Sequence, residues 1–345
     1  MGYTGRSRYG KGIAMKTILR NVALVPCALI VSGMMSRGIG AEFKTPEPRS
    51  RAAVEAVLAE APGPPAEDQL RTLHVVLLAD VKDHGPGAHD YPLWQKRWAL
   101  LLGGRQAAGD AVKQINLFGP PVQDGAGEAV SGAARVKVTT AWKWPSTEQL
   151  GSADLIVMQC YRSGGATSRT WSDERIAELE AYLARGGGFA VVHPATYTVR
   201  DLSQPGSDRI TALSGLAFDR SIIVRHGPIK LKITASDHPI CLGLPETIEL
   251  IDEPYWPPRG DLSKVTVLAT SDESVPKGSD NISPHPMFWT CRHGAGRIFT
   301  CVPGHFTWTF DDPYFRILLL RGMAWAAGES PYRFDPLVTR GIPLR

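Results

Sequence analysis

Short apolar runs recur along the chain, and polar segments with helical spacing lie between them. Apolar side chains fill residues 73–79, 154–158 and 189–192 almost without interruption. Such runs are typical of strands that are buried on both faces of a parallel sheet. We therefore expect these three segments to form neighbouring parallel strands of one sheet.

Amphipathic segments separate the apolar runs. Residues 94–102 end at a glycine pair, and residues 172–185 begin with a serine, a residue type that caps helix N-termini. A third segment, 314–327, shows the same helical spacing near the end of the chain. The helix over 172–185 is expected to cross between the strands 154–158 and 189–192 in the right-handed sense.

Other strands are predicted on either side of these elements. Residues 135–140 and 265–269 are short apolar segments, and residues 229–233 alternate as a half-exposed strand does. Residues 287–291 and 297–302 are separated by a short glycine-containing segment and predict a hairpin. The alternation of strands and helices predicts an α/β fold with a doubly wound, mostly parallel sheet in a single domain. A ligand site is expected at the carboxyl ends of the strands.

The first 41 residues have the pattern of an export signal. Lys16 and Arg20 precede an apolar run over residues 22–35, and small residues follow. This run is shorter than the ~20 residues that a membrane-spanning helix needs. We expect cleavage close to Glu42, a periplasmic or extracellular location, and no stable membrane insertion after cleavage; an uncleaved anchor is the alternative. The expected organisation is a signal peptide (1–41), a linker or arm (42–72), a folded domain (73–328) and a C-terminal tail (329–345).

The charge of the chain is concentrated in its leading segment. The whole sequence holds 38 basic and 34 acidic residues, a formal net charge of +4. Six of the basic residues and none of the acidic ones precede residue 42, so the remainder carries 32 basic against 34 acidic groups, a net charge of −2. A faintly acidic body lacks the electrostatic footprint of a nucleic-acid-binding protein. No nucleic-acid partner is therefore expected.

The cysteines do not predict a disulfide framework. Four of them lie beyond the leading segment, at Cys160, Cys241, Cys291 and Cys301. Their wide and irregular spacing matches neither a zinc-binding motif nor the pattern of a disulfide-rich domain. We expect thiols within the core, although an oxidising compartment would also permit one or two disulfides.

Several polar side chains lie just past predicted strands or, in the case of Glu253, just past another apolar stretch. Four of the nine histidines and one glutamate have such positions: His84, His89, His193, Glu253 and His305. Because the carboxyl ends of parallel strands meet at one edge of the sheet, we expect these groups to share a crevice. The alternative for each is an ordinary structural role, as a solvated loop residue, a buried histidine bonded to the backbone, a strand cap or a surface charge.

Histidines and a carboxylate in a crevice support three kinds of chemistry. They can bind a divalent metal, transfer protons near neutral pH, or bind sugar hydroxyls by hydrogen bonds. Sequence spacing does not separate these three. The sequence contains no phosphate-binding glycine loop, no dinucleotide fingerprint, no nucleophile elbow with a serine and no HExxH motif. No nucleotide cofactor is therefore expected.

An ordered series of five motifs resembles the ThuA-like (trehalose utilisation) proteins. The resemblance covers about residues 73–328. Its motifs are the segments 83–91, 186–193, 237–245, 252–256 and 294–305. It implies a flavodoxin-like fold related to class I glutamine amidotransferases and a role in carbohydrate metabolism, with a sugar dehydrogenase acting in the same pathway.

Two departures accompany this resemblance. The amidotransferases carry a cysteine at the turn after the strand that here ends at residue 192, whereas this chain has His193 there and no cysteine nearby. Glutamine hydrolysis through a thiolate is therefore excluded. In the acidic motif, Pro254 stands between Glu253 and Tyr255 in place of a non-proline apolar residue, which restricts Glu253 to extended conformations and leaves its carboxylate in place.

The leading hypothesis is an exported enzyme that acts on a sugar or keto-sugar as a lyase, isomerase or hydrolase. His193, Glu253 and His305 are the candidate catalytic residues, and Glu253 is the candidate base. A divalent metal would be held by His84, His89, His193, Glu253 and His305. Tyr255, Trp256 and Trp308 are the candidates for contacting a small-molecule carbohydrate. The alternative is a carbohydrate-binding or scaffold protein without catalytic activity, in which the same groups bind hydroxyls.

Overall fold

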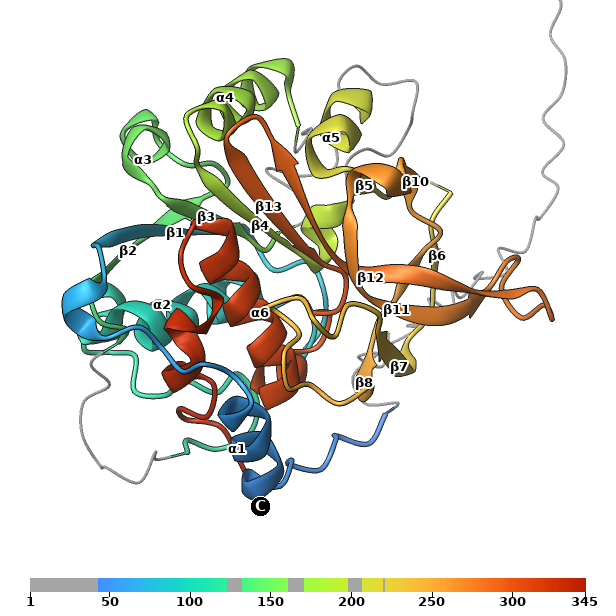
Figure 1. The fold of residues 1–345 in the computed structure, drawn as a ribbon, viewed down its shortest axis with the longest axis horizontal. Helices are drawn as coiled ribbons and strands as arrows, with labels where there is room; N and C mark the ends of the chain where they lie inside the picture. Colours follow the sequence, from blue (N-terminus) through green and yellow to red (C-terminus); the bar gives the residue numbers. More distant parts are fainter. Residues whose placement is uncertain (1–42, 123–131, 161–170, 198–206, 220) are drawn as a thin grey trace, which may run out of the picture. The chain divides into compact units, whose positions relative to one another are not determined.

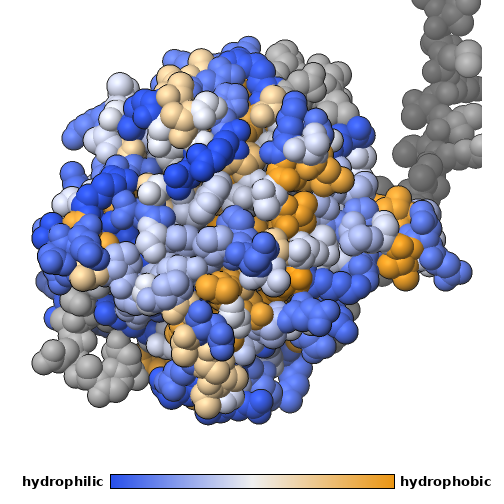
Figure 2. Space-filling model, in the orientation of Figure 1, coloured by the Kyte–Doolittle hydropathy of each residue, from blue (hydrophilic) through white to orange (hydrophobic). Residues whose placement is uncertain are grey.

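The computed structural model describes residues 43–122, 132–160, 171–197, 207–219 and 221–345. The predicted export signal lies outside these residues. Within them, no helix is both long and apolar enough to cross a membrane. On the face drawn in Figure 2, hydrophilic residues cover most of the surface and apolar ones form smaller patches.

A nine-stranded sheet organises the domain, and one half of it is parallel. This half contains, in spatial order, β2 (Val136–Trp142), β1 (Leu73–Ala79), β3 (Leu155–Met158), β4 (Gly188–Val192) and β13 (Gly296–Cys301). The strands β1, β3 and β4 are adjacent and parallel, as their buried apolar runs predicted. The doubly wound α/β fold is thereby confirmed, with its parallel strands at the core of the sheet (Figure 1).

The other half of the sheet is antiparallel. It contains β12 (Ile282–His293), β11 (Thr266–Ser274), β7 (Gly227–Ile233) and β8 (Thr247–Asp252), and β8 is the edge strand. The hairpin predicted from the short segment before residue 297 is the β12–β13 pair. Because β7 and β8 are antiparallel, Gly227 at the start of β7 lies opposite Asp252 at the end of β8. Residues that precede β7 therefore lie near those that follow β8.

Two small ribbons complete the strands. β5 (Leu216–Ala217) pairs with β10 (Arg259–Gly260), and β6 (Ile223–Val224) pairs with β9 (Tyr255–Trp256). The second ribbon begins three residues after β8, so the chain that contains Glu253 is bounded by a strand on each side.

Helices cover both faces of the sheet. One face holds α1 (Arg51–Ala59), α2 (Tyr91–Ala108) and α6 (Pro313–Ala326), and the other holds α3 (Thr147–Ser152), α4 (Asp173–Ala184) and α5 (Ser207–Ser214), as Figure 1 shows. Successive side chains of a strand point to opposite faces. In β1, Leu73, Val75 and Leu77 accordingly contact the first layer, whereas Val76 and Leu78 contact the second.

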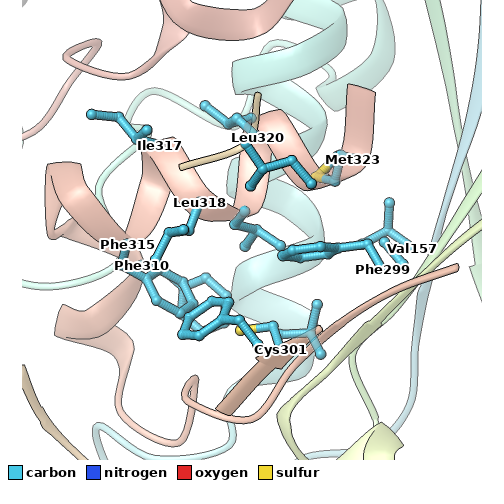
Figure 3. Close-up of a cluster of buried hydrophobic side chains, with 14 of the residues drawn as sticks. Val157, Phe299, Cys301, Phe310, Phe315, Ile317, Leu318, Leu320 and Met323 are labelled. Atoms are coloured by element: carbon cyan, nitrogen blue, oxygen red, sulfur yellow. The ribbon is translucent and has the colours of Figure 1, made fainter. Parts of the chain in front are cut away.

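The helix α6 packs closely on the middle of the sheet. Its side chains, among them Phe315, pack together with Phe310 around Phe299 of β13 and Val157 of β3 (Figure 3). A Cβ atom at Gly322 would lie 2.4 Å from the Phe299 ring, so only glycine permits this approach. The helix thereby fixes β13 and the turn that follows it.

Both flanking segments pack into the same compact unit as the sheet. The segment before α1 is joined to the end of the chain, because Arg345 donates its backbone N–H to the carbonyl of Arg49 and accepts one from Arg51. Residues Pro331–Leu337 form a 3₁₀ helix in which Asp335 pairs with the buried Arg321 at 2.8 Å. The arm and the tail therefore extend the folded domain beyond residues 73–328.

The four cysteines in the described part of the chain are free, buried thiols. Cys160 follows β3, Cys291 and Cys301 lie in the β12–β13 hairpin, and Cys241 lies in the turn between β7 and β8. Burial raises the pKa of each thiol, so these cysteines are core residues as expected.

Candidate metal centre

Two of the site histidines occupy unusual backbone positions. His193 directly follows β4 and has a φ of +52°, and His89 precedes α2 with a φ of +43°. A positive φ is uncommon for residues other than glycine and costs about 1–3 kcal/mol. At His193 it turns the chain sharply at the carboxyl edge of the sheet, where this turn directs the imidazole toward the site.

Four predicted residues converge at this edge. Ligand atoms of His89, His193, Glu253 and His305 all lie within 4.8 Å of one another, and all four side chains are buried. The Nε2 atom of His193 lies 2.9 Å from Nε2 of His89 and 3.3 Å from Oε2 of Glu253. The same Glu253 oxygen lies 2.9 Å from Nδ1 of His305. Side chains that are far apart in the sequence therefore meet at this edge of the sheet, as expected.

Hydrogen bonds on the outer side of the cluster orient two of the imidazoles. The Nδ1 atom of His193 lies 2.6 Å from the carbonyl oxygen of Val302, which can only accept, so Nδ1 donates and the lone pair of Nε2 faces the cluster. The Nδ1 atom of His89 lies 2.9 Å from Asp83 and 2.8 Å from the hydroxyl of Tyr91. Histidines that bind metals commonly donate their second nitrogen to a carbonyl or carboxylate in this way.

A buried carboxylate joins the two loops that carry Glu253 and His305. Oδ1 of Asp252 accepts the backbone N–H groups of Glu253, Gly304 and His305 at 2.7, 2.9 and 3.0 Å. Its other oxygen accepts the hydroxyl of Thr309. Asp252 therefore positions the cluster without belonging to it.

The electrostatics favour neutral imidazoles at His89 and His305 beside an ionised carboxylate. Burial, together with the neighbouring His193 and His305, lowers the pKa of His89 to about 3. Burial also lowers the pKa of His305. Burial alone would raise the pKa of Glu253, but its close contacts with His193, His226 and His305 hold it well below its usual range. These are the protonation states that metal binding requires.

His84 lies outside the buried cluster. Its side chain is 35% exposed, and its Nδ1 atom lies 2.9 Å from Oδ1 of Asp83. Its ring centroid is 3.8 Å from that of His89 and 5.2 Å from that of His305. Hydrogen bonds from His84 and His89 lower the pKa of Asp83 although burial opposes this. His84 and Asp83 thus line the solvent side of the centre.

His226 was not among the predicted residues, yet it belongs to this site. Its Nε2 atom lies 3.1 Å from Oε1 of Glu253, and its ring lies 4.8 Å from that of His305. The prediction considered only residues that follow strands, whereas His226 precedes β7. The signal that would have found it is the antiparallel direction of β7, which brings its first residue to the edge where β8 ends.

The three residues proposed to contact a sugar have different surroundings. Tyr255 stacks on His193 with ring centroids 4.8 Å apart, and its hydroxyl lies 3.1 Å from Nε2 of that histidine. Trp256 is fully buried and donates its indole N–H to the carbonyl of Ser274, so it has no exposed face for stacking. Trp308 donates to the carbonyl of Ile251 and is 7% exposed. Of the three, only Tyr255 contacts the cluster.

The donor set fits a divalent transition metal. Three imidazoles and one carboxylate are typical ligands of zinc and related ions. Nε2 of His305 is buried and has no hydrogen-bond partner among the described residues, so a bound ion could satisfy it. His89, His193 and His305 would hold the ion. The carboxylate of Glu253 lies within 4.8 Å of the ligand atoms of all three histidines.

Comparison with known proteins places the chain in a family. The family model described as ThuA, trehalose utilisation, matches residues 103–326, which is more than half of the 345 residues. The chain belongs to the ThuA family. None of the curated proteins matches this ThuA-family protein. The resemblance found in the motifs is thereby confirmed.

Solved structures similar to this ThuA-family protein include two ThuA-like proteins. The one from Parabacteroides merdae is 19% identical, with 75% of this chain and 92% of that chain covered and a TM-score of 0.47. The one from Bacteroides uniformis is 16% identical, with 79% and 99% covered and a TM-score of 0.48. A β-galactosidase from Rahnella sp. R3 is 12% identical, with 74% of this chain and 31% of that chain covered and a TM-score of 0.42.

Proposed function

We propose that this ThuA-family protein is an exported enzyme of carbohydrate metabolism that acts on a sugar or keto-sugar. The observation that carries the proposal is the convergence of His89, His193, Glu253 and His305 in one buried cluster. Burying four titratable groups is costly unless they are paired or bind a ligand. A bound ion would also give a partner to Nε2 of His305, a buried nitrogen that has none among the described residues.

Different residues would bind the metal and transfer the proton. His89, His193 and His305 would hold a divalent metal, which when bound would place positive charge beside a carbonyl or hydroxyl oxygen of the sugar. Glu253 is ionised, because its pKa lies well below the usual range. Its carboxylate is the proton acceptor in the proposed reaction. In the enolisation or β-elimination of a keto-sugar, Glu253 takes the proton from the carbon next to the carbonyl.

The substrate class follows from the same chemistry. Removal of a carbon-bound proton requires an adjacent carbonyl group, which a non-reducing disaccharide such as trehalose lacks. A sugar dehydrogenase in the same pathway would supply the keto-sugar. Family membership in trehalose utilisation supports a carbohydrate substrate.

The experiment measures metal content and turnover in the same preparations. Protein purified without added metal is analysed for divalent metals and incubated with 3-keto-glucosides and with their parent disaccharides, and the products are identified by mass spectrometry. Glu253→Gln should retain the metal and lose turnover, whereas His305→Ala should lose both. His285→Ala, which removes a histidine of β12, is the matched control.

Two outcomes would count against this function. Sugar binding with no product from any substrate would favour the carbohydrate-binding alternative. Full turnover by Glu253→Gln with the metal still bound would exclude Glu253 as the base.

A further inference from the structure

We propose that this protein has a second carbohydrate-binding site, separate from the metal centre. The site is a cavity of about 380 Å³ between residues 45–49 of the arm and the edge strand β8. Its remaining wall is formed by Phe118 and the segment 308–313. The volume lies within the range of small-molecule binding sites. The proposal does not depend on the reaction proposed for the metal centre.

The arm is fixed in place, so the cavity is formed before a ligand binds. Nε of Arg49 lies 2.7 Å from Oδ2 of Asp312, and a second guanidinium nitrogen donates to the carbonyl of Glu249 at 2.8 Å. The same guanidinium lies over the ring of Tyr314, 4.3 Å from its centroid. In Figure 1 this arm is the blue segment that leads into α1. A preformed cavity avoids the entropy cost of ordering a loop on binding.

The outer edge of β8 offers hydrogen-bond donors to the cavity. The carbonyls of Glu249 and Ile251 point away from β7, because they accept from the side chains of Arg49 and Trp308. In a β-strand, the N–H and the carbonyl of one residue point to the same side. Both point away from the partner strand when the residue belongs to a non-hydrogen-bonded pair. The N–H groups of Glu249 and Ile251 therefore face the cavity, and neither has an acceptor among the described residues.

This pattern of donors favours a polyol over an added peptide strand. A strand that paired with β8 would need both its N–H and its carbonyl groups. Here the carbonyls of Glu249 and Ile251 are already occupied by side chains. Hydroxyl oxygens can accept from the free N–H groups without using those carbonyls.

Aromatic and charged residues narrow the ligand to a neutral sugar. Phe118 is 37% exposed and packs edge-on against Trp308 at 5.5 Å, so it offers a ring to the apolar C–H face of a sugar. Glu47, Glu249, Asp311 and Asp312 line the cavity with Arg49 as the single basic lining residue. Arg49 is paired with Asp312, and Asp311 is paired with the buried Arg316. The lining residues therefore offer no unpaired cation to a phosphorylated or acidic sugar, and Glu249 adds negative charge, so a neutral sugar is favoured.

Two stacked rings separate this cavity from the metal centre. Trp308 stacks on Phe306 with centroids 4.3 Å apart, and Phe306 packs edge-on against His305 at 4.5 Å. A ligand beside Trp308 would therefore leave the metal ligands uncovered. Binding in the cavity and metal binding should be separable by mutation.

The test is isothermal titration calorimetry with trehalose and with trehalose 6-phosphate. Phe118→Ala should weaken trehalose binding about tenfold or more, because the exposed ring is lost. Thr45→Trp should block trehalose binding, because the indole would fill the cavity from the arm. This second variant tests the site even if Phe118→Ala is unstable. Leu262→Ala, which removes an exposed apolar side chain elsewhere, is the matched control and should leave the affinity unchanged.

The metal-centre variant His305→Ala separates this proposal from the proposed function. It should lose metal and retain trehalose binding, and Phe118→Ala should retain metal. The proposal is overturned if neither cavity variant weakens binding, if trehalose does not bind, or if the 6-phosphate binds more tightly. It is also overturned if trehalose binding is lost in His305→Ala alone, a result that would place the sugar at the metal centre and leave the proposed function standing.

Discussion

Substitution of His193 separates its two roles, as a metal ligand and as a hydrogen-bond donor to the backbone. The side chain is fully buried, so its loss should also affect the stability of the fold. His193→Ala removes the donor of the 2.6 Å hydrogen bond to the carbonyl of Val302. Leaving a buried acceptor unsatisfied costs about 1–3 kcal/mol. His193→Asn replaces that donor with an amide, and asparagine adopts a positive φ more readily than alanine.

The two variants should therefore differ in stability and agree in metal content. In urea denaturation of the metal-free protein, we expect His193→Ala to lose about 1–3 kcal/mol and His193→Asn to recover most of that loss. Neither variant should contain stoichiometric metal, because both lack Nε2. Stoichiometric metal in His193→Asn would refute the assignment of His193 as a ligand. Equal stability of the alanine variant and the native protein would refute the structural role of its Nδ1 atom.

Four further predictions concern other parts of the molecule. Burial lowers the pKa of His89 to about 3, below the ~6.5 of a histidine in the unfolded chain. As the pH decreases, the unfolded chain therefore takes up this proton before the folded protein does. The free energy of unfolding of the metal-free protein should accordingly fall between about pH 6.5 and pH 3. His89→Gln should flatten this dependence in urea midpoints measured above pH 4.5. Gly322→Ala should cost about 1–3 kcal/mol in the same assay, whereas Gly151→Ala, where a Cβ meets nothing within 4 Å, should cost little. Asp252→Asn should weaken metal affinity about 10–100-fold in competition with a chelator, because the loops it joins would lose their alignment. Intact mass of exported protein should place the mature N-terminus close to Glu42, and retention of the initiator methionine would exclude cleavage.

The parallel half of the sheet could be predicted because its strands are short, apolar and interrupted by capped helices. Residues 154–158 and 189–192 correspond to β3 and β4 within one residue at each end. The antiparallel half of the sheet was harder to predict from the sequence. The segment of β8 was recognised only as an apolar stretch, because its alternating burial gives a weak signal and pairing direction is not encoded locally.

The candidate site could be predicted in part for the same reason. His193 and His305 follow strands whose order in the sheet brings their ends together, and the structure confirms that they share one cluster. His226 and the positioning role of Asp252 depend on the pairing of β7 with β8, which sequence alone did not reveal. The burial of Trp256 likewise depends on its pairing with Ile223, a long-range contact.

Anomalous diffraction tests the central claim most directly. Crystals grown from protein purified without added metal would be measured at the absorption edges of zinc, iron and manganese. We predict one peak within roughly 2.0–2.6 Å of imidazole nitrogens of His89, His193 and His305. The absence of any peak, or a peak that contacts none of these three histidines, would contradict the assignment of this cluster as a metal centre.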